Sequence, residues 1–121
     1  IAKGDFTLWS GLNASDHFIR MSERPTAIMC MNDEMAIGAM KGLKAKDISI
    51  PGDISVTGFD DMEFAKYSVP ALTTIAQPAE KLGEKSAELL FQLIEGKSPQ
   101  QTEHILPVEF IIRQSTSAPK S

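Results

Sequence analysis

The sequence has little of what disulfide-linked and metal-binding proteins require. Among its 121 residues there is one cysteine, Cys30, and there are two histidines, His17 and His104. A single cysteine cannot form an internal disulfide, which fits the reducing cytoplasm, where we expect this protein to act. Neither histidine has a zinc-site spacing to Cys30, so the sequence predicts no bound metal and no cofactor. Cys30 lies in an apolar run, where a buried, inert thiol is expected.

Long hydrophobic runs and an excess of basic residues are also missing. No apolar run approaches the ~20 residues that a membrane-spanning helix needs, so we expect no membrane partner. The 12 Lys and Arg residues are outnumbered by 16 Asp and Glu residues, which gives a formal net charge of −4. Binding to nucleic acid phosphates needs a concentrated basic face, so this chain is not expected to bind DNA itself. The sequence also has no phosphate-binding glycine loop and no nucleophile elbow, and it predicts no catalytic residues and no enzyme.

Three apolar, strand-like runs each stop at residues suited to holding a small molecule. The runs and the residues near their ends are 1–5 with Phe6, 27–31 with Asn32 and Asp33, and 54–58 with Asp60 and Asp61. Helical patterns separate the runs, which predicts parallel strands in one sheet with their carboxyl ends at one edge. Ligands of open α/β sheets bind at that edge. We therefore expect an aromatic ring, a carboxamide and a carboxylate to line a single mouth.

Helix signals and the last apolar segment complete the expected α/β domain. Helices are expected over residues 8–23, from a cap at Asn32 or Asp33 to about residue 45, and over residues 78–96. A final strand is expected over residues 104–115. There is no initiator Met, and the first residues have the pattern of a strand's end, so we expect a fragment of a larger fold.

Each candidate ligand residue also has a purely structural interpretation. Asp60 and Asp61 could be solvated loop residues that cap the next turn, although Asp60 lies nearer the strand. One of Asn32 and Asp33 is needed to cap the helix, which leaves the other available to face a ligand. Phe6 could stack on a flat ring, but an aromatic residue after a strand often belongs to the core.

Four segments of the sequence together resemble the lactose/galactose repressor (LacI/GalR) family of transcriptional regulators. They are Pro25–Ile28 leading into Asn32–Met40, Ile50–Asp61, Pro70–Pro78 and Ile111–Thr116. The resemblance covers essentially the whole chain and keeps the order of the motifs. Residues 1–7 and 72–78 are most similar to the cytidine repressor branch of the family.

The resemblance implies a two-lobed core of the periplasmic-binding-protein-like type I fold, with a parallel-sheet α/β lobe. Residues 1–121 would form the carboxy-terminal part of the effector-binding and dimerisation domain. The helix over residues 78–96 would cross to a first lobe that is missing from this chain, as is the DNA-binding head.

Functional residues and partners follow from the same resemblance. Phe6 matches the aromatic residue that stacks on the effector, Asn32 a polar contact, and Asp60 the aspartate that bonds the sugar or base. Gln77 matches a further contact at the lobe crossover. The resemblance implies a small-molecule effector, cytidine above all, or a sugar. It also implies operator DNA bound through the absent head, a possible co-regulator protein, and a homodimer. The family's dimer contacts map to residues 7–12, the helix from Ala36, and residues 64–69.

Two other functions remain open on the residues alone. A solute-binding protein of a transport system has the same two-lobed architecture. A phosphotransfer-type α/β domain could use Asp60 and Asp61 to bind Mg²⁺, with Asp33 as the third acid.

Overall fold

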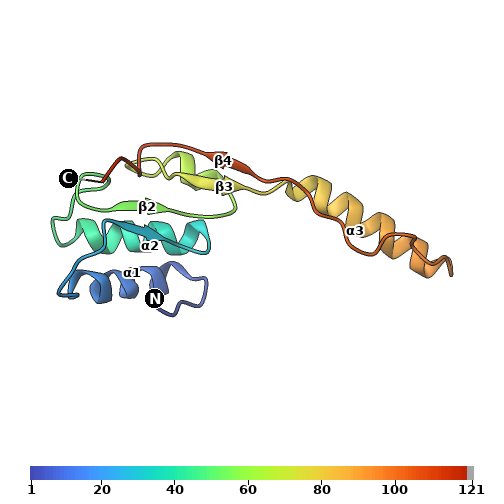
Figure 1. The fold of residues 1–121 in the computed structure, drawn as a ribbon, viewed down its shortest axis with the longest axis horizontal. Helices are drawn as coiled ribbons and strands as arrows, with labels where there is room; N and C mark the ends of the chain where they lie inside the picture. The colour runs from blue at the N-terminus through green and yellow to red at the C-terminus, as the bar shows by residue number, and fades with distance from the viewer. Residues whose placement is uncertain (120–121) are drawn as a thin grey trace. The chain divides into compact units, whose positions relative to one another are not determined.

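The computed structural model describes residues 1–119, which divide into two compact units. One unit comprises residues 1–76 with the segment from Phe110 onward, and the other comprises residues 77–109. Along the chain the elements are α1 (Leu8–Ile19), β1 (Ala27–Met29), α2 (Asp33–Lys44), β2 (Ser55–Thr57), the 3-10 helix η1 (Glu63–Lys66), β3 (Thr74–Ala76), α3 (Ala79–Ile94) and β4 (Glu109–Ile111) (Figure 1). This order confirms the predicted α/β class.

The strands β1 and β2 of the first unit run parallel, as the sequence predicts. β1 pairs with β2 in parallel, with Ile28 opposite Val56. Parallel bridges continue from the end of β2 to the next segment, joining Thr57 to Thr73 and Asp60 to Ala76. β3 in turn pairs with β4. The carboxyl ends of the second and third predicted runs therefore lie at one edge of the parallel β1–β2 pair.

The prediction of a strand over residues 1–5 is wrong, because these residues belong to no strand in the described part of the chain. Local side-chain hydrogen bonds shape this segment instead. The Thr7 hydroxyl and the Thr7 N–H both donate to Asp5 Oδ1, over 2.6 and 3.1 Å, and Asp5 N–H donates to Ser10 Oγ over 3.2 Å. Such bonds compete with a strand ladder. The positive φ of Phe6, 67°, then turns the chain into α1.

Capping side chains define the starts of the first two helices. Thr7 Oγ1 accepts a hydrogen bond from Ser10 N–H at the start of α1, and Asn32 Oδ1 accepts one from Met35 N–H at the start of α2. The predicted cap of the second helix is thus confirmed as Asn32. α1 ends at Ile19, four residues before the predicted end. Pro25 disfavours a helical conformation only at Arg24, the residue before it, so it does not account for this earlier end.

Glycines bring α1 and α2 into close contact. A Cβ atom on Gly11 would lie 2.0 Å from the Met35 carbonyl oxygen, and one on Gly38 would lie 1.9 Å from the Leu8 carbonyl oxygen. Neither position has room for a side chain, so both glycines are needed for the two backbones to approach this closely. In Figure 1, α2 lies between α1 and β2.

Buried aliphatic side chains from α2, the strands and the connecting loops form the core of the first unit. Leu43, Ile54, Val56 and Leu72 are fully buried there. They pack with other buried residues, namely Ile28, Ala36, Met40, Ile48 and Ala65. This core fixes α2 against the sheet and thereby places the first turn of α2 at the carboxyl edge of the strands.

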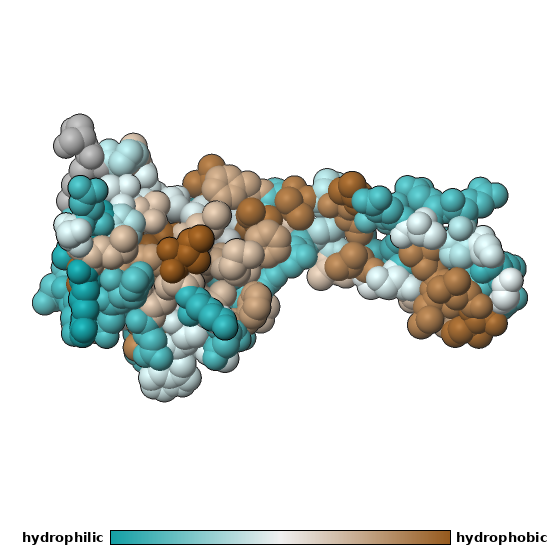
Figure 2. Space-filling model, turned by 60° about the horizontal axis from the view of Figure 1, so that its bottom comes forward, coloured by the Kyte–Doolittle hydropathy of each residue, from teal (hydrophilic) through white to brown (hydrophobic). Residues whose placement is uncertain are grey.

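The second unit has a helix but no buried core among the described residues. α3 begins after Pro78 and ends before Gly96, whose φ is 74°, close to the predicted limits, yet none of its residues is buried. Its apolar side chains are at least half exposed at Leu90, Phe91, Leu93 and Ile94. Figure 2 shows hydrophobic surface along this part of the chain.

The last strand is much shorter than predicted. The sequence predicts a strand over residues 104–115, but only Glu109–Ile111 pairs as β4. A strand needs a hydrogen-bonded neighbour, and within residues 1–119 the segment 104–108 lies in no sheet. None of the helices in the described range is long and apolar enough to cross a membrane.

Candidate functional site

The candidate site begins at the first turn of α2, directly after β1. Asn32 uses both ends of its carboxamide within the protein. Its Oδ1 accepts from Met35 N–H over 2.9 Å, and its Nδ2 donates to the Phe6 carbonyl oxygen over 2.9 Å. Asn32 therefore caps the helix and also links it to Phe6, which lies 26 positions earlier in the sequence.

Phe6 is held at this edge with its ring accessible. Its left-handed backbone conformation, with φ 67°, is uncommon for a residue with a Cβ atom. The hydrogen bond from Asn32 fixes the carbonyl group, while the residue remains 60% exposed. The alternative that Phe6 belongs to the core is wrong.

Asp60 and Asp61 follow β2 in a loop with two successive left-handed residues. Their φ angles are 109° and 54°. Asp60 N–H donates to the Ile75 carbonyl oxygen over 2.9 Å, which ties the loop to β3. Asp61 Oδ1 forms an ion pair with Arg113 Nη2 at 2.6 Å, with side chains that are 19% and 13% exposed. Asp61 is thus a structural residue, whereas Asp60 is half-buried at the end of the strand.

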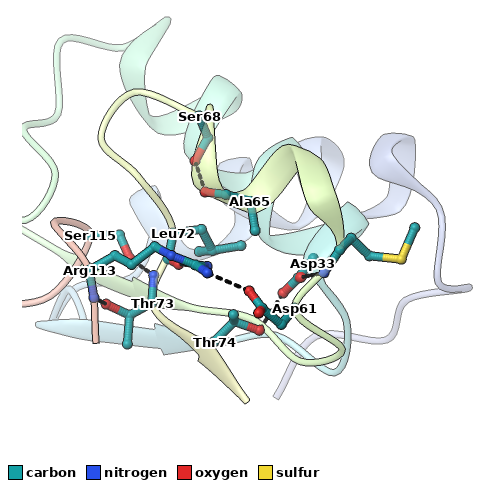
Figure 3. A network of polar contacts seen from close by, with 10 residues as sticks. Asp33, Asp61, Ala65, Ser68, Leu72, Thr73, Thr74, Arg113 and Ser115 are labelled. Atoms are coloured by element: carbon teal, nitrogen blue, oxygen red, sulfur yellow. Dashed lines mark hydrogen bonds and ion pairs between the residues drawn. The ribbon is translucent and has the colours of Figure 1, made fainter. Parts of the chain in front are cut away.

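Asp33 lies at the centre of a polar network beneath this loop (Figure 3). It is fully buried, and both carboxylate oxygens accept hydrogen bonds: Oδ1 from the Thr74 hydroxyl over 2.6 Å and Oδ2 from Met62 N–H over 2.7 Å. Burial raises the pKa of the Asp33 carboxyl above its usual value, and the nearby Asp60 and Asp61 charges act in the same direction. The two hydrogen bonds oppose that shift. Asp33 is therefore not the residue that faces a ligand.

Arg113 and Thr74 are members of this network that the sequence does not reveal. Arg113 Nη1 donates to the Leu72 carbonyl oxygen over 2.9 Å, and Arg113 N–H donates to Thr73 Oγ1 over 2.9 Å. These contacts span 40 residues or more along the chain. The only local hint is an arginine and a threonine within or beside strand-like runs, which is too common to indicate a site.

Gln77 belongs to the second unit, where it is exposed just before α3. Its proposed contact with a ligand stays a prediction.

The three acids of the phosphotransfer alternative differ in how they are bonded within the protein. Both oxygens of Asp33 and one oxygen of Asp61 are already bonded within the protein. Over residues 1–119 no group of three or more His, Cys, Asp or Glu side chains is arranged to hold a metal ion.

A second surface of the first unit collects the segments expected at the dimer interface. An open, mainly apolar groove is lined by Leu8 of α1, Ile37 of α2, and Phe64 and Tyr67 of the η1 region. Tyr67 is 75% exposed and the nearby Val69 is 77% exposed. The predicted segments 7–12, α2 and 64–69 therefore contribute to one apolar groove.

Comparison with known proteins identifies the family. Residues 2–116 match the model of the periplasmic binding protein-like domain. The chain belongs to this family. That result agrees with the parallel sheet and with the residues gathered at its carboxyl edge, and it accounts for nearly the whole chain.

Relatives of this chain within the periplasmic binding protein-like family include transcriptional repressors. The repressor CytR of Escherichia coli K12 is 36% identical over 118 residues, which are 98% of this chain and 35% of CytR. This chain spans about a third of the length of the curated relatives it matches. Repressors with other names match at similar identity, 36–40%, so identity alone does not single out the cytidine branch.

Solved structures give the same picture. A LacI-family regulator of Enterococcus faecium with bound ribose aligns with a TM-score of 0.87 and 36% identity, covering 99% of this chain and 44% of that one. The lac repressor dimer bound to operator and the anti-inducer ONPF also aligns with a TM-score of 0.87 and 36% identity. It covers 95% of this chain and 40% of the repressor. The LacI/GalR resemblance and the expected fold are confirmed.

Proposed function

We propose that this chain is the carboxy-terminal part of the effector-sensing and dimerisation domain of a DNA-binding transcriptional repressor. The observation that carries the proposal is the meeting of Phe6, Asn32 and the Asp60 loop at the carboxyl edge of the parallel strands. Asn32 is bonded to Phe6, and Asp33 beside it is bonded to the loop of Asp60. Repressors among the relatives, and a neighbour that holds ribose, support the assignment.

The chemistry of the edge favours a ligand with a flat or ring-shaped face and several hydroxyl or N–H donors. The exposed Phe6 ring offers a stacking surface. The Asp60 carboxylate can accept hydrogen bonds from ligand hydroxyls or ring N–H groups, and its charge strengthens them. Asn32 retains a second amide hydrogen and further acceptor capacity on Oδ1. A nucleoside meets these demands with both its base and its ribose, and we propose cytidine first and a free sugar second.

In the complete protein the ligand would lie between two lobes, with Gln77 as an additional contact. The exposed apolar face of α3 would then be covered by the first lobe, to which this helix would cross. Ligand can change operator affinity only if it binds the two lobe arrangements with different affinities. A homodimer formed through the groove of Ile37 and Tyr67 would present two DNA-binding heads to a two-fold symmetric operator. Such a protein would act in the cytoplasm, and a co-regulator protein is compatible with this arrangement.

Calorimetry on the full-length protein tests the proposal, with cytidine and ribose as separate titrants. Asp60→Ala should weaken binding of whichever ligand binds the parent by roughly 10- to 100-fold, because a charge-assisted hydrogen bond contributes about 1.5–3 kcal/mol. Asp47→Ala is the matched control, since Asp47 is also an aspartate with positive φ, 58°, but lies just past the far end of α2. Equal affinities of parent and Asp60→Ala would refute the site.

A second measurement distinguishes a repressor from a solute-binding protein of a transport system. Adding the ligand to the full-length protein should change its affinity for operator DNA, measured by fluorescence anisotropy. A protein that binds the ligand but shows no specific DNA affinity in either state would be a solute-binding protein instead.

A further inference from the structure

The network in Figure 3 contains a buried carboxylate that would not touch a ligand in the proposed site. We propose that Asp33 is a positioning residue that holds the 60–62 loop so that Asp60 faces the ligand. This inference rests on the proposed function, because it concerns the same site. It assigns to Asp33 a role distinct from helix capping, which Asn32 performs.

The 60–62 loop needs external support because of its backbone. Two successive non-glycine residues have left-handed φ angles of 109° and 54°. Such conformations persist only where the surrounding structure determines them. The direction of the Asp60 side chain depends on these angles, so whatever fixes them also fixes the proposed ligand contact.

Three successive residues of the loop are each anchored to a different part of the first unit. Asp60 N–H donates to the Ile75 carbonyl oxygen, Asp61 pairs with Arg113, and Met62 N–H donates to Asp33 Oδ2. The Asp33 anchor is the only one of these three that comes from α2. It therefore links Asp60 to the helix whose cap, Asn32, bonds to Phe6.

The position of Asp33 is itself fixed on several sides. The Thr74 hydroxyl holds Oδ1 at 2.6 Å. Gly58 leaves the space that Oδ1 occupies, since a Cβ atom there would lie 2.2 Å from it. The carboxylate is fully buried and cannot rotate into solvent without breaking both hydrogen bonds. Adjacent residues of one rigid helix turn thus set the separation between Phe6 and Asp60.

The test compares Asp33→Ala with Asp33→Asn in the full-length protein. The amide oxygen of Asn can still accept from Met62 N–H, and Thr74 can accept from its NH₂ group, so Asn preserves the anchor without the charge. Two quantities are measured well below the melting temperature: the ligand Kd for cytidine or ribose, and hydrogen–deuterium exchange over residues 60–62.

We expect Asp33→Ala to weaken ligand binding by about 10-fold or more and to accelerate exchange at Met62, since it removes a charge-assisted bond. Asp33→Asn should remain within about 3-fold of the parent in affinity, with slow exchange. Glu63→Ala removes an exposed acid next to the loop and should change neither quantity. If Asp33→Ala lowers only the melting temperature, or if both Asp33 variants weaken binding equally, the positioning role is overturned.

Thr74→Val keeps the test decisive if Asp33→Ala fails to fold. It removes one bond to Asp33 with little change of shape, and exchange over residues 60–62 should still rise measurably; unchanged exchange would count against the proposal. Exchange is measured without ligand, so it separates this inference from the proposed function. Asp60→Ala that leaves Kd unchanged refutes the ligand site, whereas slow exchange in Asp33→Ala refutes the positioning role.

Discussion

Replacing Gly58 by alanine should destabilise the protein, because the new methyl group would collide with the Asp33 network. The added Cβ would lie 2.2 Å from Asp33 Oδ1, 3.0 Å from Leu72 Cδ2 and 3.1 Å from Asp33 Cα. Two of these atoms cannot move easily, since Asp33 Cα is helix backbone and Leu72 is fully buried. The carboxylate must therefore shift and weaken its bonds to Thr74 and Met62.

The magnitude of this destabilisation follows from three effects. Overpacking a well-packed site costs about 1–3 kcal/mol. Loss of one charge-assisted hydrogen bond adds roughly 1.5–3 kcal/mol. Restricting the unfolded chain by replacing glycine with alanine gains about 0.4–1 kcal/mol. The free energy of unfolding should therefore fall by about 1.5–5.5 kcal/mol.

Gly83→Ala is the matched control for this prediction. Apart from its chain neighbours and the nearby backbone of its own helix, no atom of the described residues lies within 4 Å of the position that its Cβ would occupy, and Gly83 is in the interior of α3. The unfolded-state effect is the same in both variants, and alanine is the better helix former by up to ~1 kcal/mol. Urea denaturation should show Gly83→Ala at or above the parent stability. A Gly58→Ala protein within ~0.5 kcal/mol of the parent would refute the close packing around Asp33.

Two further predictions concern the dimer groove and Cys30. Ile37→Glu places a charge in the apolar groove and should shift the protein from dimer to monomer in sedimentation velocity, whereas Ser22→Glu, in the exposed α1–β1 loop, should not. An Ile37→Glu dimer of parent strength would exclude this groove as the interface. Burial raises the pKa of the Cys30 thiol to about 11, so alkylation by iodoacetamide at pH 8 should be slow in the folded protein and fast after unfolding. Equal rates in the two states would show that Cys30 is not protected.

The sequence predicts elements well where the signal is local. Asn32 before an apolar helical pattern indicates the start of α2, and Pro78 with Gly96 brackets α3 closely. The parallel order of the strands follows from their alternation with helices. Elements that need a distant partner are predicted poorly. The strand expected over residues 104–115 pairs only at 109–111, because pairing depends on a neighbour that periodicity does not reveal.

The residues of the candidate site show the same contrast between local sequence signals and partners far along the chain. Phe6, Asn32 and Asp60 are predicted as ligand contacts from their positions after strand-like runs, and the structure links the first two directly. Asp33 has the same sequence signal as Asn32, yet it is buried because Thr74 and Met62, 41 and 29 residues away, provide its hydrogen bonds. Arg113 carries no sequence signal for its pairing with Asp61. Hydrogen bonds and ion pairs from residues far along the chain decide these roles, and they form only when the chain folds.

The most direct test of the account is a crystal structure of the full-length protein grown with cytidine or ribose. A ligand should be stacked on the Phe6 ring, with one of its hydroxyl groups or the exocyclic amino group of the cytosine within hydrogen-bond distance of the Asp60 carboxylate. A ligand bound elsewhere, with both residues facing solvent, would contradict it.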